Sequence, residues 1–224
     1  HIYVDITRPI QGVDMDYAVI FDMDGVVSDT QKLHARVESE LLAQLGVAIS
    51  PEEITRRFAG MSLTQQFGEL LWGKRAHYDM QLVEKEKWRR MADLAKQGVD
   101  PVKGSVETLI ELVYHFRLGL GSASVLPYVE SVLHALDVRP LFESVVTGDM
   151  VAQGKPAPDI FLRVARELHI PPSRCVVIED GKSGMIAAAR AGMKCIALVP
   201  QISDEYPTQH QICSLYELNQ GYIR

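Results

Sequence analysis

The sequence contains few cysteines, and those it has are widely spaced. Cys175, Cys195 and Cys213 form no close pair of the kind found in zinc knuckles or redox motifs. Two of them lie inside apolar runs, which favours buried, reduced thiols and a cytoplasmic protein. We therefore expect the cysteines to be structural rather than reactive.

Long apolar segments and an excess of positive charge are also missing. No run approaches the roughly 20 apolar residues that span a bilayer, and residues 1–14 lack the basic-then-apolar order of a secretion signal. The net charge of -6 disfavours nucleic acid, whose backbone is held mainly by Lys and Arg clusters. We expect neither a membrane nor a nucleic-acid partner, and we interpret residues 1–14 as a tag or an extension.

Five short apolar runs alternate with amphipathic segments over most of the chain. The runs are rich in Val, Ile and Leu, and none alternates cleanly between apolar and polar residues, which is typical of parallel strands covered on both faces. Strands that alternate with helices predict a doubly wound, Rossmann-like α/β sheet. The expected strands are 17–21, 117–121, 144–147, 175–179 and 195–199.

The interval between the first two expected strands contains only helical patterns. Ser50, Pro51 and Glu53 predict a helix start there, with Ser50 as N-cap and Glu53 closing a capping box. We therefore predict a helical cap at residues 31–101, inserted into a core formed by residues 1–30 and 102–224. At 224 residues the chain is long enough for both units.

Charged and hydroxyl side chains follow four of the expected strands. Ligands bind at the carboxyl ends of the strands in open parallel sheets, so these side chains are expected to meet. Two like charges about 4 Å apart repel by about 4 kcal/mol at an effective dielectric near 20. A hard cation, with Mg²⁺ favoured, is therefore expected among carboxylates that have no His or Cys beside them. The residues are Asp22, Asp24, Ser122, Lys155, Glu179 and Asp180.

The same residues carry a resemblance to a known family. The chain resembles the haloacid dehalogenase superfamily, in the branch that has a helical cap and includes phosphatases and beta-phosphoglucomutases. The match runs from about residue 17 to about residue 200. Its four motifs are, in chain order, Asp22-Met23-Asp24-Gly25 with Asp29, Ser122, Lys155 in GKPAPDIF, and the pair Glu179-Asp180.

The resemblance implies a division of labour among the acidic residues. Asp22 would attack phosphorus and form an aspartyl-phosphate, which splits one difficult displacement into two steps. Asp24 would protonate the leaving oxygen and later deprotonate water. Asp22, the backbone carbonyl of Asp24, Glu179 and Asp180 would hold Mg²⁺.

The resemblance also implies which groups contact the substrate. Ser122, the turn amide of Ala123 and Lys155 would bind the phosphoryl oxygens, whose charge grows in the transition state. His34 and Ser62 are candidate contacts from the cap. A closing cap would limit the substrate to a small phosphorylated metabolite.

Two departures from the family pattern bear on the reaction. Leu63 follows the Gly60-Met61-Ser62 turn, where the similar mutases carry an arginine for a second phosphate, and Gly181 replaces a serine found in many relatives. We therefore predict a Mg²⁺-dependent phosphatase, acting as a monomer or weak homodimer. A sugar-phosphate mutase is the alternative, and a non-catalytic binding protein is the third hypothesis.

Overall fold

A six-stranded parallel sheet forms the centre of the molecule. The structure, a computed structural model, describes residues 16–58, 63–73 and 78–223. The strands lie in the order β3-β2-β1-β4-β5-β6, and every pairing is parallel. This topology confirms the predicted doubly wound α/β fold. The strands are β1 (Ala18–Phe21), β2 (Arg117–Gly121), β3 (Ser144–Val146), β4 (Cys175–Glu179), β5 (Lys194–Leu198) and β6 (His210–Ile212).

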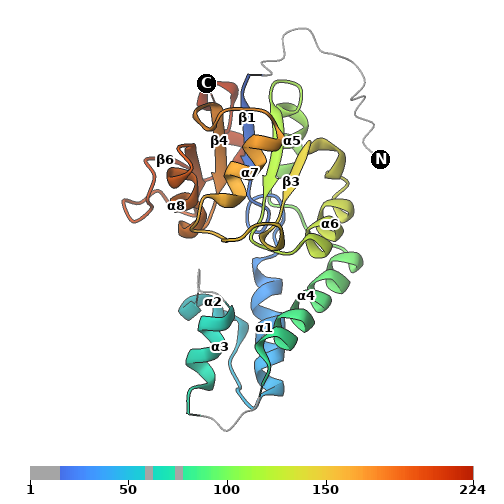
Figure 1. Ribbon diagram of the computed structural model, residues 1–224. Helices are drawn as coiled ribbons and strands as arrows, with labels where there is room; N and C mark the ends of the chain where they lie inside the picture. The colour runs from blue at the N-terminus through green and yellow to red at the C-terminus, as the bar shows by residue number, and fades with distance from the viewer. Residues whose placement is uncertain (1–15, 59–62, 74–77, 224) are drawn as a thin grey trace.

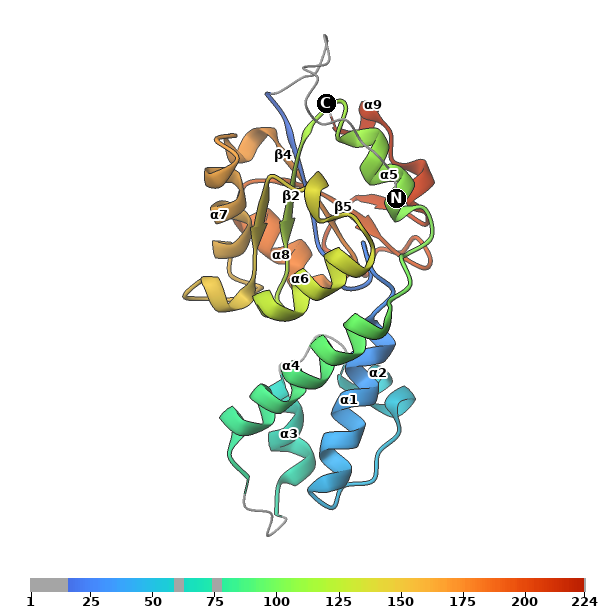
Figure 2. The same ribbon diagram turned by 90° about the vertical axis from the view of Figure 1, so that its right-hand side faces the viewer.

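Helices cover both faces of this sheet, as Figures 1 and 2 show. Along β1, Val19 and Phe21 belong to the apolar cluster beneath α5 and α6, whereas Ala18 and Ile20 belong to the cluster beneath α7 and α8. Both sides of the strand are buried, which explains why its sequence is apolar throughout. The helices are α5 (Ser105–Leu112), α6 (Leu126–Ala135), α7 (Asp159–Glu167), α8 (Lys182–Arg190) and α9 (Gln220–Ile223).

Four further helices lie beyond one end of the sheet (Figure 1). Phe67 of α3 and Met91 of α4 are fully buried, and they share one continuous apolar cluster with the sheet. Helix α4 also runs beneath α6, so the cap helices contact the core directly (Figure 2). These helices are α1 (Gln31–Gln44), α2 (Pro51–Phe58), α3 (Leu63–Leu71) and α4 (Met80–Gln97).

One local expectation needs correction, and one strand was not predicted. Ser50 caps α2 by accepting a hydrogen bond from the backbone of Glu53 at 3.1 Å, but the Glu53 carboxylate accepts from Arg57 at 2.9 Å and does not complete the predicted capping box. Strand β6 was not expected, because its sequence HQI contains a single apolar residue.

None of the helices in the described ranges is both long enough and apolar enough to cross a bilayer.

Candidate active site

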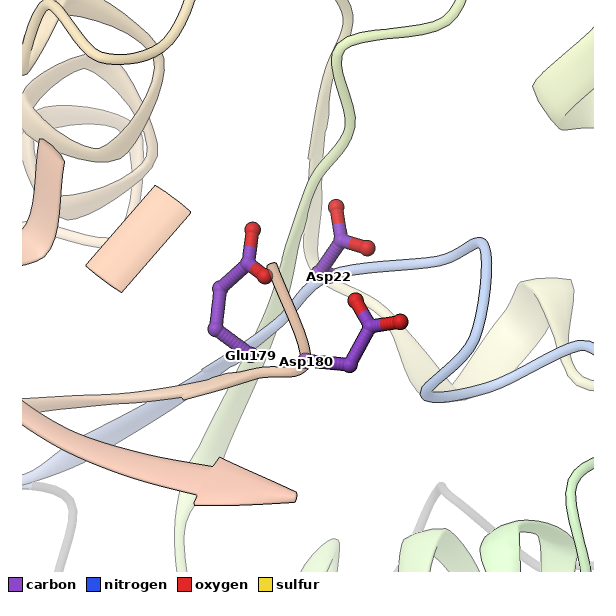
Figure 3. Close-up of side chains that lie close together, drawn as sticks. All are labelled: Asp22, Glu179 and Asp180. Atoms are coloured by element: carbon purple, nitrogen blue, oxygen red, sulfur yellow. The ribbon is translucent and has the colours of Figure 1, made fainter. Parts of the chain in front are cut away.

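Three carboxylates meet where β1 and β4 end. Asp22 directly follows β1, and its backbone N–H donates to Ile178 of β4 at 2.9 Å, so the pairing of the two strands continues to this residue. Glu179 ends β4, and Asp180 follows it. One oxygen from each of the three carboxylates lies within 4.8 Å of the others (Figure 3). The parallel sheet thus brings together acidic groups that are more than 150 residues apart in the sequence.

Lys155 supplies the positive charge inside this cluster. It lies in the loop between β3 and α7, and its Nζ is 2.6 Å from Asp22 Oδ1 and 2.7 Å from Glu179 Oε1. Its side chain is only 4% exposed. Because a buried charge is stable only when it is paired and hydrogen-bonded, this lysine and the two carboxylates depend on one another.

The cluster retains an excess of negative charge. Burial, followed by the charge of Glu179, raises the pKa of Asp180 from 3.8 to about 7. Burial also raises the pKa of Asp22, although Lys155 opposes the shift. For Lys155 the effect of burial is outweighed by Asp22 and Glu179, so its pKa lies above the usual value. One lysine therefore does not offset three crowded carboxylates.

Asp24 has a different environment. Its Oδ1 accepts hydrogen bonds from Thr30 at 2.5 Å and Tyr128 at 2.9 Å and lies 3.0 Å from His34 Nε2, while Oδ2 accepts from Ser124 at 2.9 Å. Burial acts to raise the pKa of Asp24, but His34 and the hydroxyl donors hold it well below its usual range. Burial and the charge of Asp24 raise the pKa of Tyr128, so its hydroxyl stays protonated and donates.

The oxygen atoms at this site suit a hard divalent cation. Asp22, Glu179 and Asp180 offer only carboxylate oxygens, the donors that Mg²⁺ prefers. Gln31 Nε2 donates to the backbone carbonyl of Asp24 at 3.0 Å and lies 3.4 Å from Asp180 Oδ2. Because one nitrogen atom reaches both the Asp24 carbonyl oxygen and Asp180 Oδ2, the two oxygens face the same point in space. Two ligands of one metal ion must do the same.

Two glycines allow the carboxylates to approach the backbone. Gly25 has a φ of +92°, and a Cβ at this position would overlap the carboxylate of Asp180. A Cβ at Gly184 in α8 would likewise overlap the carboxylate of Glu179. The motif glycine of the first loop is therefore required both for its left-handed backbone and for the space it leaves.

The expected phosphate-binding residues lie at the same edge of the sheet. Ser122 directly follows β2 and is fully buried, its N–H donates to Val146 at 3.0 Å, and its Oγ accepts from the Ser124 N–H at 3.1 Å. Ala123 is exposed in this turn. Because Ser124 bonds to Asp24, the turn after β2 is tied directly to the loop after β1.

The two candidate cap contacts have different outcomes. His34 lies in the first turn of α1, where its ring contacts the Asp24 carboxylate. Ser62 lies outside the described residues.

Sequence reasoning missed Thr30 and Tyr128 as partners of Asp24. Thr30 follows the first motif immediately, so its position gave a usable signal, whereas Tyr128 is 104 positions away from Asp24 and had none.

Comparison with known proteins places the chain in a family. The model of the haloacid dehalogenase-like hydrolases matches residues 19–198, and the chain belongs to this family. Fructose-1-phosphate phosphatase YqaB of Escherichia coli (strain K12) is 30% identical over 184 residues, which cover 80% of this chain and 94% of that protein. The predicted class, a phosphoric monoester hydrolase of this family, is confirmed by relatives with such names.

Solved structures give the same result. CbbY from Rhodobacter sphaeroides in complex with xylulose-(1,5)bisphosphate is 27% identical, with a TM-score of 0.79, and the match covers 93% of this chain and 99% of that one. The beta-phosphoglucomutase pgmB from Clostridium difficile is 26% identical, with a TM-score of 0.77 and coverages of 93% and 96%. The predicted phosphatase and mutase branch of the family is thereby confirmed.

The raised pKa of Asp180 predicts how stability depends on pH in metal-free protein. Folded Asp180 binds a proton below about pH 7, whereas the unfolded chain does so only near 3.8. The free energy of unfolding in EDTA should therefore rise as the pH falls from about 7 toward 4, by on the order of 2–4 kcal/mol. Urea unfolding at each pH measures it.

Asp180→Asn is the control for this titration, because the amide cannot take up the proton. The rise in stability should be much smaller in this variant than in the wild type. Parallel curves for the two proteins would contradict the assignment of the effect to Asp180.

Proposed function

We propose that the protein is a Mg²⁺-dependent cytoplasmic phosphatase that hydrolyses a small phosphomonoester of the sugar-phosphate class through an aspartyl-phosphate. The observation that carries this proposal is the environment of Asp22, whose carboxylate contacts Lys155 and lies among further carboxylates at the sheet edge. The name of the 30%-identical relative, fructose-1-phosphate phosphatase, supports the substrate class.

Asp22 is the proposed nucleophile. One of its carboxylate oxygens forms a bond to phosphorus while the bond from phosphorus to the leaving oxygen breaks, and the electron pair of that bond stays on the leaving oxygen. Water then attacks the aspartyl-phosphate and releases inorganic phosphate. Lys155, 2.6 Å from Asp22 Oδ1, is placed to offset the charge on the phosphoryl oxygens in both steps.

Asp24 is the proposed acid and base. It gives a proton to the leaving oxygen in the first step and takes one from the attacking water in the second. Only Met23 separates it from Asp22, so both side chains belong to the same loop after β1. Ser122 and the Ala123 amide, in the neighbouring turn, are proposed to bind the phosphoryl oxygens.

Asp22, Glu179, Asp180 and the carbonyl oxygen of Asp24 would hold Mg²⁺. When bound, the ion supplies Lewis-acid stabilisation of the transferring phosphoryl group. The Gln31 amide, which contacts two of these oxygens in this structure, would then need other partners. Glu179 is already bonded to Lys155 and to the Gly181 N–H, so it suits an indirect role beside the ion.

The cap is proposed to limit the substrate to small esters. Helix α4 contacts α6 of the core, so the cap helices lie beside the catalytic edge. We expect the cap to exclude a phosphorylated protein from the site. His34 and Ser62 remain the proposed cap residues near the leaving group. The contact of His34 with Asp24, the proposed acid and base, supports this role for His34.

A sugar-phosphate mutase is the second candidate. The structural likeness to a beta-phosphoglucomutase favours it. Leu63 disfavours it, because an apolar side chain cannot bind the second phosphate of a bisphosphate intermediate. Retention of all four motifs disfavours a protein that only binds its ligand.

Asp22→Asn should abolish hydrolysis, because an amide is a very poor nucleophile. We expect kcat on p-nitrophenyl phosphate and on a panel of sugar phosphates to fall at least about 1000-fold. Phosphate release in Mg²⁺ buffer measures this, and the wild type should lose activity in EDTA. Asp204→Asn, the same change at an exposed aspartate, is the matched control and should retain full activity. Comparable activity in Asp22→Asn and the wild type would refute the mechanism.

Incubation with beta-glucose 1-phosphate and a trace of the bisphosphate separates the two candidate reactions. A phosphatase should release inorganic phosphate faster than it forms glucose 6-phosphate, because water is its acceptor. Faster formation of glucose 6-phosphate would establish the mutase instead. A coupled dehydrogenase assay and a phosphate assay measure the two products in the same sample.

A further inference from the structure

Asp24 is held from both the cap and the core. His34 reaches it from the first turn of α1, whereas Tyr128 reaches it from α6 on the opposite side of the interface. Tyr128 donates its hydroxyl to Asp24 Oδ1 at 2.9 Å. This tyrosine is outside the family motifs found in the sequence.

The ring of Tyr128 has little freedom to move. It is fully buried, and it packs against His34 at a centroid distance of 5.7 Å and an angle of 89°. Trp88 of α4 packs against it at 5.7 Å and 37°, and also contacts the His34 ring at 5.9 Å. Close-packed aromatic neighbours from two elements therefore fix the position of the hydroxyl.

A proton-transferring carboxyl group must hold one orientation, because a small displacement of the reacting atoms greatly slows the transfer. The Asp24 side chain has two rotatable bonds, and donors hold both of its oxygens, with Tyr128 on Oδ1 and Ser124 on Oδ2. An oxygen that already accepts several hydrogen bonds has no room for a proton of its own. Oδ1, the acceptor from Thr30 and Tyr128, is such an oxygen.

We propose that Tyr128 is a positioning residue that fixes Asp24 in the orientation from which Oδ2 delivers its proton to the leaving oxygen. This inference rests on the proposed phosphatase function. Its donors hold Asp24 as a carboxylate in this structure, so Asp24 first takes up a proton from solvent on Oδ2, the oxygen that accepts from Ser124. In the step concerned, the bond from phosphorus to the leaving oxygen breaks, that oxygen keeps the electron pair, and this proton passes to it. Asp24 is left as a carboxylate, and the water that attacks in the second step returns the proton.

The inference predicts a dependence on the leaving group. A sugar alkoxide is strongly basic and needs the proton from Asp24, whereas p-nitrophenolate is weakly basic and leaves without one. The value of kcat/KM reports the steps up to departure of the leaving group. Loss of the positioning hydroxyl should therefore lower kcat/KM for a sugar phosphate and spare kcat/KM for p-nitrophenyl phosphate.

Tyr128→Phe is the variant that tests this, because it keeps the ring against Trp88 and removes only the hydroxyl. The substrates are p-nitrophenyl phosphate and the sugar phosphate that the wild type hydrolyses fastest. We expect kcat/KM to fall roughly 10-fold for the sugar phosphate, a part of the ~10²–10⁴-fold contribution of a general acid. The value for p-nitrophenyl phosphate should change by less than about twofold.

The ratio of the two kcat/KM values is measured in one sample, so any loss of folded protein cancels from it. Tyr114→Phe is the matched control. Tyr114 precedes β2 and so lies at the amino ends of the strands, away from the site, and loss of its hydroxyl should leave the ratio unchanged. An equal fall for both substrates in Tyr128→Phe would assign the residue a purely structural role and overturn the inference. An unchanged ratio with full activity would overturn it as well.

The wild type is measured first on both esters. If the wild type hydrolyses neither ester in Mg²⁺, the proposed function is overturned, and the inference with it. Wild-type turnover combined with an unchanged ratio in Tyr128→Phe would overturn the inference alone. The two failures are therefore distinguishable.

Discussion

The buried contact of Lys155 with Asp22 and Glu179 is the interaction on which the site depends. Without the lysine, the carboxylates at the end of β1 and β4 would face one another in a poorly solvated place, at a repulsion of several kcal/mol. With it, the cluster still carries excess negative charge, as the raised pKa values of Asp22 and Asp180 indicate. The folded protein therefore maintains an unbalanced site that a divalent cation can complete.

The parallel sheet makes this unfavourable arrangement possible. Because all of its strands run in the same direction, the residues that follow β1, β2 and β4 meet at one edge, with the loop after β3 beside them. The free energy that offsets the repulsion comes from the burial of apolar side chains in the two clusters that cover the faces of β1. Gly25 and Gly184 then leave the space in which the carboxylates of Asp180 and Glu179 lie. Stability and chemistry are thus supplied by different parts of the same strands.

Much of this could be predicted from the sequence, because the signals are local. Apolar runs such as Cys175–Glu179 identified the strands, and acidic residues directly after them identified the site. Strand β6 was missed because an exposed edge strand of three residues needs little apolar sequence. The contact of Tyr128 with Asp24 could not be predicted, because it depends on how α6 packs over the sheet and against α4. Local sequence patterns are enough to predict where strands end. The distant side chains that bond to a given carboxylate can be identified only from the tertiary structure.

Thermal melting in EDTA and in Mg²⁺ at pH 7 tests the unbalanced charge most directly, with the wild type compared with Asp180→Asn. Because the substitution removes one of the crowded carboxylates, the variant should melt at a higher temperature than the wild type in EDTA, at about 2–4 °C for each kcal/mol relieved. Mg²⁺ should raise the melting temperature of the wild type and have little effect on the variant. A variant that melts lower in EDTA, or that is stabilised by Mg²⁺ as much as the wild type, would contradict the account.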